Sequence, residues 1–241
     1  ILSSRSAVWR SGCTNKGAAE MYRWVIFDLD GTLLNTIDDL ADAGNWVCEQ
    51  HGWPVHTIKE YRYMVGNGIP KLVERFTPAE HRDPETLKQV LAEFSARYDA
   101  HKEDKTAAYP GMVDLIRRLD EAGTVTAVLS NKADALAGPV VERYYPGLFT
   151  IVQGALPDLP VKPDPALLHR LMKRLGAEAQ NTLFVGDSNV DIRTAKNGGL
   201  SGCGVLWGFR TQAELEEEDA DFLVSDPQQL YALITAKDGK N

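Results

Sequence analysis

The stretch WVIFDLDGTLLNT, residues 24–36, places two carboxylates at the end of an apolar run. Trp24–Phe27 has the length and composition of a buried β-strand. Asp28 and Asp30 follow it, separated by one residue, and two carboxylates this close repel each other. Because a hydrophobic core gains nothing from such a pair, the pattern indicates a functional site where the first strand ends.

Short apolar runs alternate with amphipathic segments over most of the chain, which is typical of βαβ units and a parallel sheet. The candidate strands are 24–27, 125–129, 149–152, 182–185, 204–207 and 222–224. The candidate helices are about 112–122, 133–144, 164–175, 189–197, 211–218 and 227–236. The strands are apolar throughout, so we expect helices on both faces of the sheet. The sequence therefore predicts an α/β fold with a doubly wound, Rossmann-like parallel sheet.

One long segment has helical periodicity and no strand-like run. In TIDDLADAGNWVCEQHG, which starts at Thr36, the apolar side chains recur along one helical stripe, with Thr36 or Asp38 as the expected N-cap. GIPKLVERF and PETLKQVLAEFSARYDAH continue in the same style. The sequence therefore predicts an all-helical cap domain inserted into the core, with the cap at 36–108 and the core at 21–35 and 109–241.

The charge balance disfavours partners that carry dense negative charge. The formal net charge is -8 at pH 7, so nucleic acids and anionic membranes would repel the chain. No apolar stretch approaches the ~20 residues that a membrane span needs. The three cysteines are scattered and form no CxxC pattern, which favours a reducing compartment. We therefore expect a cytoplasmic protein without nucleic-acid or membrane partners. The sequence does not decide between a monomer and a homodimer.

Residues 1–20 differ in composition from the rest of the chain. Serine, glycine and alanine are frequent there, and no acidic residue precedes Glu20. The segment lacks the apolar stretch of a secretory signal. We expect it to be a disordered or vector-derived leader, with Met21 as the natural start and a fragment of an organelle transit peptide as the alternative.

Polar side chains follow several of the predicted strands. Ligands of open α/β sheets bind beyond the carboxyl ends of the strands. Those positions hold Asp28, Asp30, Ser130, Asn131, Lys132, Gly186, Asp187, Ser188 and Asp191, and Lys162 precedes the helix that is expected near residue 164. We therefore expect carboxylates, a hydroxyl, an amide and an ammonium group to meet at one edge of the sheet.

This set of groups suits phosphoryl chemistry. Close carboxylates need a cation or a shared proton, and oxygen ligands without histidine suit Mg²⁺. Mg²⁺ in turn suits phosphate, and a lysine with a serine hydroxyl would complete a clamp on a phosphoryl group. Asp28 would then attack phosphorus, while Asp30 would protonate the leaving oxygen and later activate water. The expected partner is a small-molecule phosphate ester.

Four stretches resemble, in order and spacing, the motifs of the haloacid dehalogenase (HAD) superfamily. They are DLDGTL at 28–33, SNK at 130–132, KP at 162–163 and GDSNVD at 186–191. The resemblance implies that Asp28 is the nucleophile and Asp30 the general acid and base. It also implies that Ser130 and Asn131 bind the phosphoryl group and that Lys162 stabilises its charge.

The same resemblance implies a Mg²⁺ cofactor. Its ligands would be Asp28, the carbonyl of Asp30, and Asp187. Asp191 would lie behind these ligands or support Lys162.

The helical insert resembles the alpha-helical cap of one HAD subclass, and VGNGIPKLVERF at 65–76 resembles phosphoglycolate phosphatases. The C-terminal part, which contains GVLWGFRTQAELEEEDADFLVSDPQQL, resembles the same enzymes. The implied activity is hydrolysis of a small phosphate monoester, most like 2-phosphoglycolate, through an aspartyl-phosphate. Arg62, Lys71 and Arg75 are cap cations that could contact a substrate carboxylate or simply lie at the surface.

Three alternatives stay open at this point. A phosphomutase resembling β-phosphoglucomutase would use the same nucleophile, although GDSNVD favours a phosphatase over the Glu-Asp pair that is frequent in mutases. A pyrophosphatase or nucleotidase of the same superfamily would differ only in substrate. A non-enzymatic receiver module would also use Asp, Ser, Lys and Mg²⁺, but the spacing of Asp28 and Asp30 fits it poorly. The sequence does not identify the substrate among these.

Overall fold

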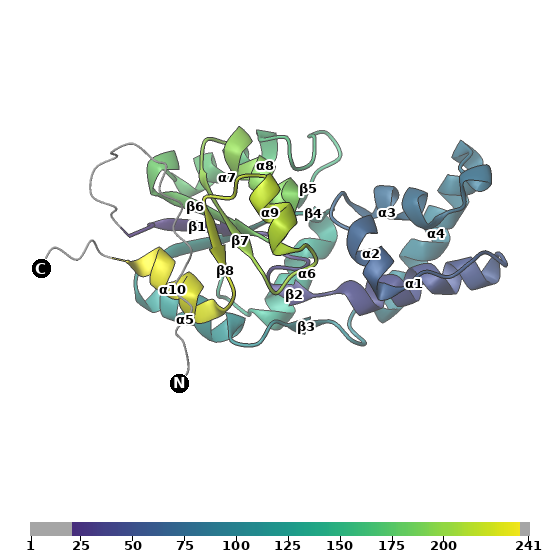
Figure 1. Ribbon diagram of the computed structural model, residues 1–241, viewed down its shortest axis with the longest axis horizontal. Helices are drawn as coiled ribbons and strands as arrows, with labels where there is room; N and C mark the ends of the chain where they lie inside the picture. Colours follow the sequence, from purple (N-terminus) through teal and green to yellow (C-terminus); the bar gives the residue numbers. More distant parts are fainter. Residues whose placement is uncertain (1–20, 237–241) are drawn as a thin grey trace, which may run out of the picture.

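The computed structural model describes residues 21–236, and its core is a six-stranded parallel sheet (Figure 1). The strand order is β5-β4-β1-β6-β7-β8. The strands are β1 (Trp24–Phe27), β4 (Val125–Ala133), β5 (Ile151–Ala155), β6 (Thr182–Gly186), β7 (Ser201–Val205) and β8 (Phe222–Val224). The chain builds outward from β1 on one side through β4 and β5, and on the other through β6, β7 and β8. The prediction of an α/β, Rossmann-like parallel sheet is confirmed.

Helices cover both faces of the sheet, because successive side chains of each strand point to opposite faces. Val25 and Phe27 of β1 lie in one buried cluster, whereas Ile26 lies in another. The first cluster includes side chains of α5 (Met112–Glu121), α6 (Asp134–Tyr144) and α10 (Pro227–Thr235). The opposite face is covered by α7 (Ala166–Leu175) and α8 (Asn189–Asn197), with α9 (Gln212–Glu217) packed against α8.

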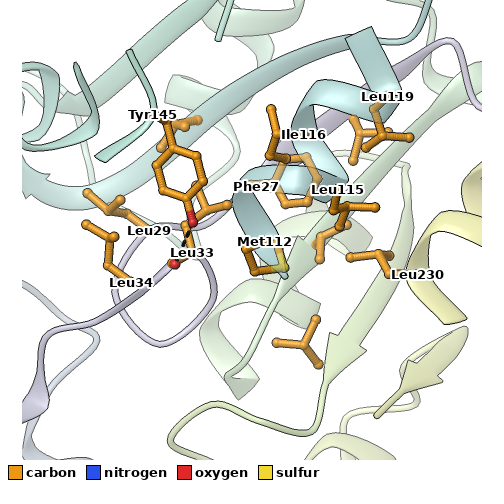
Figure 2. Close-up of a cluster of buried hydrophobic side chains, with 14 of the residues drawn as sticks. Phe27, Leu29, Leu33, Leu34, Met112, Leu115, Ile116, Leu119, Tyr145 and Leu230 are labelled. Carbon is orange, nitrogen blue, oxygen red and sulfur yellow. Dashed lines mark hydrogen bonds between the residues drawn. The ribbon is translucent and has the colours of Figure 1, made fainter. Parts of the chain in front are cut away.

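The larger of these clusters holds the turn that follows β1 in place (Figure 2). Leu29, Leu33 and Leu34 of this turn are fully buried. Next to them, the buried hydroxyl of Tyr145 donates a hydrogen bond to the carbonyl oxygen of Leu33 over 2.8 Å. Packing in the core thereby positions the backbone on which Asp30 sits.

The helical segment leaves and re-enters the core through a short antiparallel ribbon. Its strands are β2 (Leu34–Asn35) and β3 (Ala107–Ala108). Between them lie α1 (Ile37–Gln50), α2 (Ile58–Met64), α3 (Ile69–Phe76), the 3₁₀ turn η1 (Ala79–His81) and α4 (Pro84–His101). These helices enclose a hydrophobic cluster of their own and lie beyond one end of the sheet (Figure 1).

β3 corrects the expectation that residues 36–108 hold no strand, and β2 lies just before that segment. Two-residue strands are too short to produce a periodic pattern. The start of α1 differs from expectation as well. Thr36 precedes the helix, but its hydroxyl is buried without a hydrogen-bond partner and does not cap it.

Two core strands are shifted from their predicted positions. β5 begins at Ile151 rather than Phe149, and β7 covers Ser201–Val205 rather than 204–207. In β7 the residues SGCGV hide the strand, because glycine weakens an apolar pattern. A Cβ on Gly204 would lie 2.8 Å from Leu223 and 3.0 Å from Leu215. The glycine is therefore required by the close packing of neighbouring side chains against β7.

The expectation of a leader at residues 1–20 lies outside the described residues. Within 21–236, no helix is both long and apolar enough to cross a membrane. Cys48 and Cys203 are buried as free thiols.

Candidate active site

A cavity lies at the carboxyl ends of the central strands, where β1 is flanked by β4 and β6. Its volume is ≈ 60 Å³, several times the roughly 10–15 Å³ that one water needs. The core side of the cavity is lined by Asp28, Asp30, Ser130, Asn131, Lys132, Lys162, Asp187, Ser188 and Asp191. The helical segment supplies Leu40, Val65, Gly66, Gly68, Ile69 and Leu72. The structure thus brings together the polar residues that follow the strands.

Lys162 joins two of the carboxylates in the buried interior. Its Nζ lies 2.6 Å from Oδ1 of Asp28 and 2.7 Å from Oδ1 of Asp191, and all three side chains are almost fully buried. Burial alone would lower the pKa of Lys162, but the charges of Asp191 and Asp28 raise it above its ordinary value. Lys162 is therefore a charged ammonium group at neutral pH.

The side chain of Asn131 holds Lys162 in this position. Its Oδ1 accepts from the backbone N–H of Lys162 over 2.9 Å, and its Nδ2 donates to the carbonyl of Lys162 over 3.1 Å. Nδ2 also donates to the carbonyl of Gly66 in the helical segment over 2.9 Å. Both amide donors of Asn131 are thus engaged within the protein, so its side chain positions Lys162 and the turn at Gly66.

Asp191 is fully engaged by its neighbours. Oδ1 accepts from Lys162, and Oδ2 accepts from the N–H of Ser188 over 3.1 Å and from its hydroxyl over 2.6 Å. Asp191 stands in the first turn of α8, where a carboxylate also interacts favourably with the helix dipole. This geometry suits a residue that supports Lys162.

Asp187 is held between two glycines. Its Oδ2 accepts from the N–H of Phe209 over 2.7 Å. A Cβ on Gly31 would lie 2.4 Å from Oδ2 of Asp187, and a Cβ on Gly208 would lie 2.2 Å from its Cβ. Gly31 also has a φ of 94°, which other residues rarely adopt. The glycines of DLDG and WG thus make room for this carboxylate.

The carboxylates carry more negative charge than the nearby lysine balances. Burial, and then the charge of Asp191, raise the pKa of Asp187 to about 7. Burial and Asp191 likewise raise the pKa of Asp28 well above its ordinary value, although Lys162 opposes the rise. Oxygen atoms of Asp28, Asp187 and Asp191 lie within 4.8 Å of one another. A divalent cation that prefers oxygen ligands would relieve this repulsion, so the donor set fits Mg²⁺.

Asp30 faces a different partner. Its Oδ1 lies 3.3 Å from Nζ of Lys132, in an ion pair without hydrogen-bond geometry. Nζ of Lys132 donates to the hydroxyl of Tyr98 over 3.1 Å, and Tyr98 belongs to α4 of the helical segment. Sequence reasoning placed Lys132 at the strand end but assigned it no role, and nothing in the pattern around Tyr98 distinguishes it from a core residue.

Ser130 is buried on the cavity wall, and its hydroxyl oxygen accepts from the N–H of Lys132 over 3.1 Å. The hydroxyl hydrogen is left to donate into the cavity. This geometry is compatible with binding a phosphoryl oxygen.

None of the three candidate cap cations lines the cavity. Lys71 forms a solvent-exposed ion pair with Glu74 at 2.6 Å. Arg75 donates to the carbonyl of Met64 over 2.6 Å and to Oδ1 of Asn67 over 2.8 Å. The backbone carbonyl of Arg62 accepts a hydrogen bond from a core residue, Arg210.

Arg210 itself lines the cavity, and sequence reasoning missed it. It follows Phe209 in the loop after β7. The available signal was its place in WGFR, just beyond the predicted strand 204–207, where the other strand-end residues were collected.

The chain is similar to known proteins over most of its length. A phosphoglycolate phosphatase from Pseudomonas savastanoi pv. phaseolicola is 33% identical over 228 residues, which cover 91% of this chain and 82% of that protein. One from Pseudomonas putida is 34% identical over 215 residues, covering 86% and 78%. The crystal structure of a putative phosphoglycolate phosphatase from Lactobacillus delbrueckii subsp. bulgaricus matches with a TM-score of 0.86 at 29% identity, covering 90% and 100%. A model of the haloacid dehalogenase-like hydrolases matches residues 25–205, and the chain belongs to this family.

Proposed function

We propose that this protein is a Mg²⁺-dependent phosphatase that hydrolyses a small phosphate monoester, most like 2-phosphoglycolate, to glycolate and phosphate. The observation that carries the proposal is the buried ion-pair network of Lys162 with Asp28 and Asp191, beside Asp187, in one small cavity. The names of the similar proteins in two Pseudomonas species support the choice of substrate.

In this proposal Asp28 is the nucleophile. Lys162 holds one of its carboxylate oxygens, which leaves the other oxygen to attack phosphorus and form an aspartyl-phosphate. The ammonium group of Lys162 also offsets the charge that develops on the phosphoryl oxygens, because it is buried beside them and fixed by Asn131. The hydroxyl of Ser130 donates to a phosphoryl oxygen from the neighbouring strand.

Asp30 acts as the general acid and the general base. It protonates the oxygen of the leaving alcohol, and afterwards it takes a proton from the water that hydrolyses the aspartyl-phosphate. The ammonium group of Lys132, 3.3 Å from Oδ1 of Asp30, keeps the side chain oriented through both steps. Because Tyr98 holds Lys132 from α4, this orientation depends on the helical segment.

The cofactor would be held by Asp28, the backbone carbonyl of Asp30, and Asp187. When bound, Mg²⁺ supplies positive charge to the phosphoryl oxygens and offsets the repulsion between the carboxylates. Phe209 and the two glycines around Asp187 keep that carboxylate directed into the cavity.

The helical segment acts as a cap over the site. Val65, Ile69 and Leu72 form an apolar wall opposite the polar core residues, and such a wall excludes bulk water from the reacting groups. The small cavity and this wall favour a short substrate over a large sugar phosphate or nucleotide.

The decisive experiment is phosphate release from a panel of phosphate esters with Mg²⁺ and with a chelator. The panel contains 2-phosphoglycolate, glucose 1-phosphate, a nucleoside monophosphate and pyrophosphate. We expect Mg²⁺-dependent release that is fastest with 2-phosphoglycolate. Isomerisation of glucose 1-phosphate without net release would instead indicate a phosphomutase, and preference for pyrophosphate or the nucleotide would reassign the substrate. A stable phosphorylated chain without turnover would indicate a receiver module.

A further inference from the structure

Arg210 differs from the other two cations that line the cavity. Within residues 21–236, Lys162 and Lys132 each form ion pairs with carboxylates of the site, whereas Arg210 forms none. Its charge lowers the pKa of Asp187 and of Glu214 in the first turn of α9, but the Glu214 carboxylate accepts its hydrogen bonds from Thr211. No carboxylate of the described residues pairs directly with Arg210, so its guanidinium could pair with an anionic group of a ligand.

Neutral groups of the helical segment hold the guanidinium in place. Arg210 donates to the backbone carbonyls of Arg62 and Val65, the latter over 3.2 Å. It also lies over the ring of Tyr63, 5.2 Å from the ring centroid. These contacts orient the guanidinium without neutralising it, and they occupy only part of its five N–H donors.

Arg210 lines the same cavity as the residues of the proposed phosphoryl site. Arg210 directly follows Phe209, whose N–H is bonded to Asp187. A Cβ on Gly66 would lie 3.9 Å from Nη2 of Arg210, and the carbonyl of the same glycine is bonded to Asn131. Asn131 and Arg210 of the core thus bond the turn at 65–68, and residues of this turn line the cavity.

We propose that Arg210 determines substrate specificity by binding a carboxylate on the substrate, so that the enzyme prefers short phosphate esters that carry a carboxylate. This assignment rests on the proposed phosphatase function and adds the residue that selects the substrate. A guanidinium presents paired N–H donors that match the two oxygens of a carboxylate. Because Arg210 and the proposed phosphoryl-binding residues line one cavity, a short ester could contact both.

A competing explanation is that Arg210 only fastens the helical segment to the core. Arg75 provides the matched control, because its guanidinium bonds the same turn through the carbonyl of Met64 and the side chain of Asn67 but does not line the cavity. Loss of a purely mechanical contact at this turn should affect all substrates alike. Loss of a carboxylate-binding group should affect only substrates that have a carboxylate.

The test compares kcat/KM for 2-phosphoglycolate and for 2-hydroxyethyl phosphate, in which a neutral hydroxymethyl group replaces the carboxylate. The variants are Arg210→Gln, Arg210→Lys and Arg75→Gln, with thermal unfolding as a check on folding. In Arg210→Gln we expect the ratio of the two values to fall about tenfold or more, because a charge-assisted contact is lost. Arg210→Lys keeps the charge without the paired donors and should lower the ratio less. Arg75→Gln should leave the ratio at the wild-type value.

The outcomes that oppose the assignment are distinct. An equal loss for both esters in Arg210→Gln, matched by Arg75→Gln, would show a mechanical role. An unchanged ratio in Arg210→Lys would overturn the assignment even if Arg210→Gln did not fold. Wild-type hydrolysis of both esters without preference would overturn the assignment and leave the phosphatase proposal standing. Release from no ester on the panel would overturn both.

Discussion

Each side chain of the site is defined by its partner as much as by its type. Two buried carboxylates raise the pKa of Lys162 and keep it charged. Three hydrogen bonds, from Lys162 and Ser188, fix the orientation of the Asp191 carboxylate. Asn131, expected to bind the phosphoryl group, directs its amide toward Lys162 and Gly66. Single substitutions should therefore distinguish residues that take part in the reaction from residues that position them.

Asp28→Asn should remove turnover and leave the fold intact. The amide is isosteric with the carboxylate but cannot attack phosphorus, so we expect a loss of at least about 10³-fold in kcat. Burial and Asp191 raise the pKa of Asp28, so neutralising it should also increase the melting temperature without Mg²⁺. Phosphate-release assays and thermal unfolding in chelator measure the two effects. Near wild-type turnover would disprove the covalent mechanism.

The metal-free protein should lose stability as the pH rises from about 4 to about 7. The pKa of Asp187 is raised to about 7 in the folded state, whereas the unfolded chain ionises it near 3.8. Across this window the folded state binds more protons, so its stability falls with increasing pH. Asp187→Asn should make stability depend less on pH in this window. Mg²⁺ should reduce the loss of stability at higher pH in the wild type but not in the variant. Melting temperatures across the pH range provide the measurement, and identical profiles for wild type and variant would contradict this.

At the scale of elements, the end of β4 and the long helix α4 together position the side chain of Lys132. The end of β4 carries Ser130, Asn131 and Lys132, and α4 reaches across to Lys132 through Tyr98. The ring of Tyr98 stacks on Phe94 with centroids 5.8 Å apart, so the hydroxyl is carried by a packed aromatic pair. A helix remote in sequence thereby orients a residue beside Asp30.

Tyr98→Phe tests this link between α4 and the core. The variant keeps the aromatic packing and removes one hydrogen bond to Lys132, so the free energy of unfolding should fall by only about 1–2 kcal/mol. We expect kcat to decrease several-fold, because Lys132 orients Asp30 less well. Val90→Ala, which removes buried packing from the same helix and leaves the Phe94–Tyr98 pair in place, is the matched control. If the two variants lost the same kcat for the same loss of unfolding free energy, the hydrogen bond would have no separate role in orienting Lys132.

At the scale of the whole molecule, the site takes residues from both the sheet edge and the helical segment, which lies beyond one end of the sheet (Figure 1). Two short strands, β2 and β3, connect the two parts, and the contacts of Asn131 and Arg210 with the turn at 65–68 join them again across the cavity. A substrate in the cavity would therefore lie between side chains of both parts.

Asn131→Ala should loosen the helical segment and misplace Lys162 together. Removing a buried amide leaves backbone groups of Gly66 and Lys162 without partners, which costs about 1–3 kcal/mol. We expect faster amide hydrogen exchange in residues 64–69 than in the sheet, and a loss of kcat for every substrate. Arg75→Gln should change exchange in the same turn without a comparable loss of kcat. Unchanged exchange at the turn in Asn131→Ala would contradict the proposed link.

The core could be predicted from the sequence because its signals are local. β1 occupies its expected residues, and β6 and α6 differ from expectation by one residue each at an end, since apolar runs and helical periodicity arise from neighbouring residues. The strands β2 and β3 were missed because they are two residues long, and β7 was displaced by its glycines.

The sequence by itself determined the α/β sheet and the set of polar residues at its carboxyl edge, because strand ends of a parallel sheet must meet there. Only the tertiary structure decided which of them touch. Lys162 meets Asp28 across 134 residues of chain, and Arg210 meets Val65 across 145. No periodic pattern encodes such pairs, since they depend on how the helical segment and the loops pack. The same packing places Arg210 on the cavity wall and leaves Arg62, Lys71 and Arg75 off it.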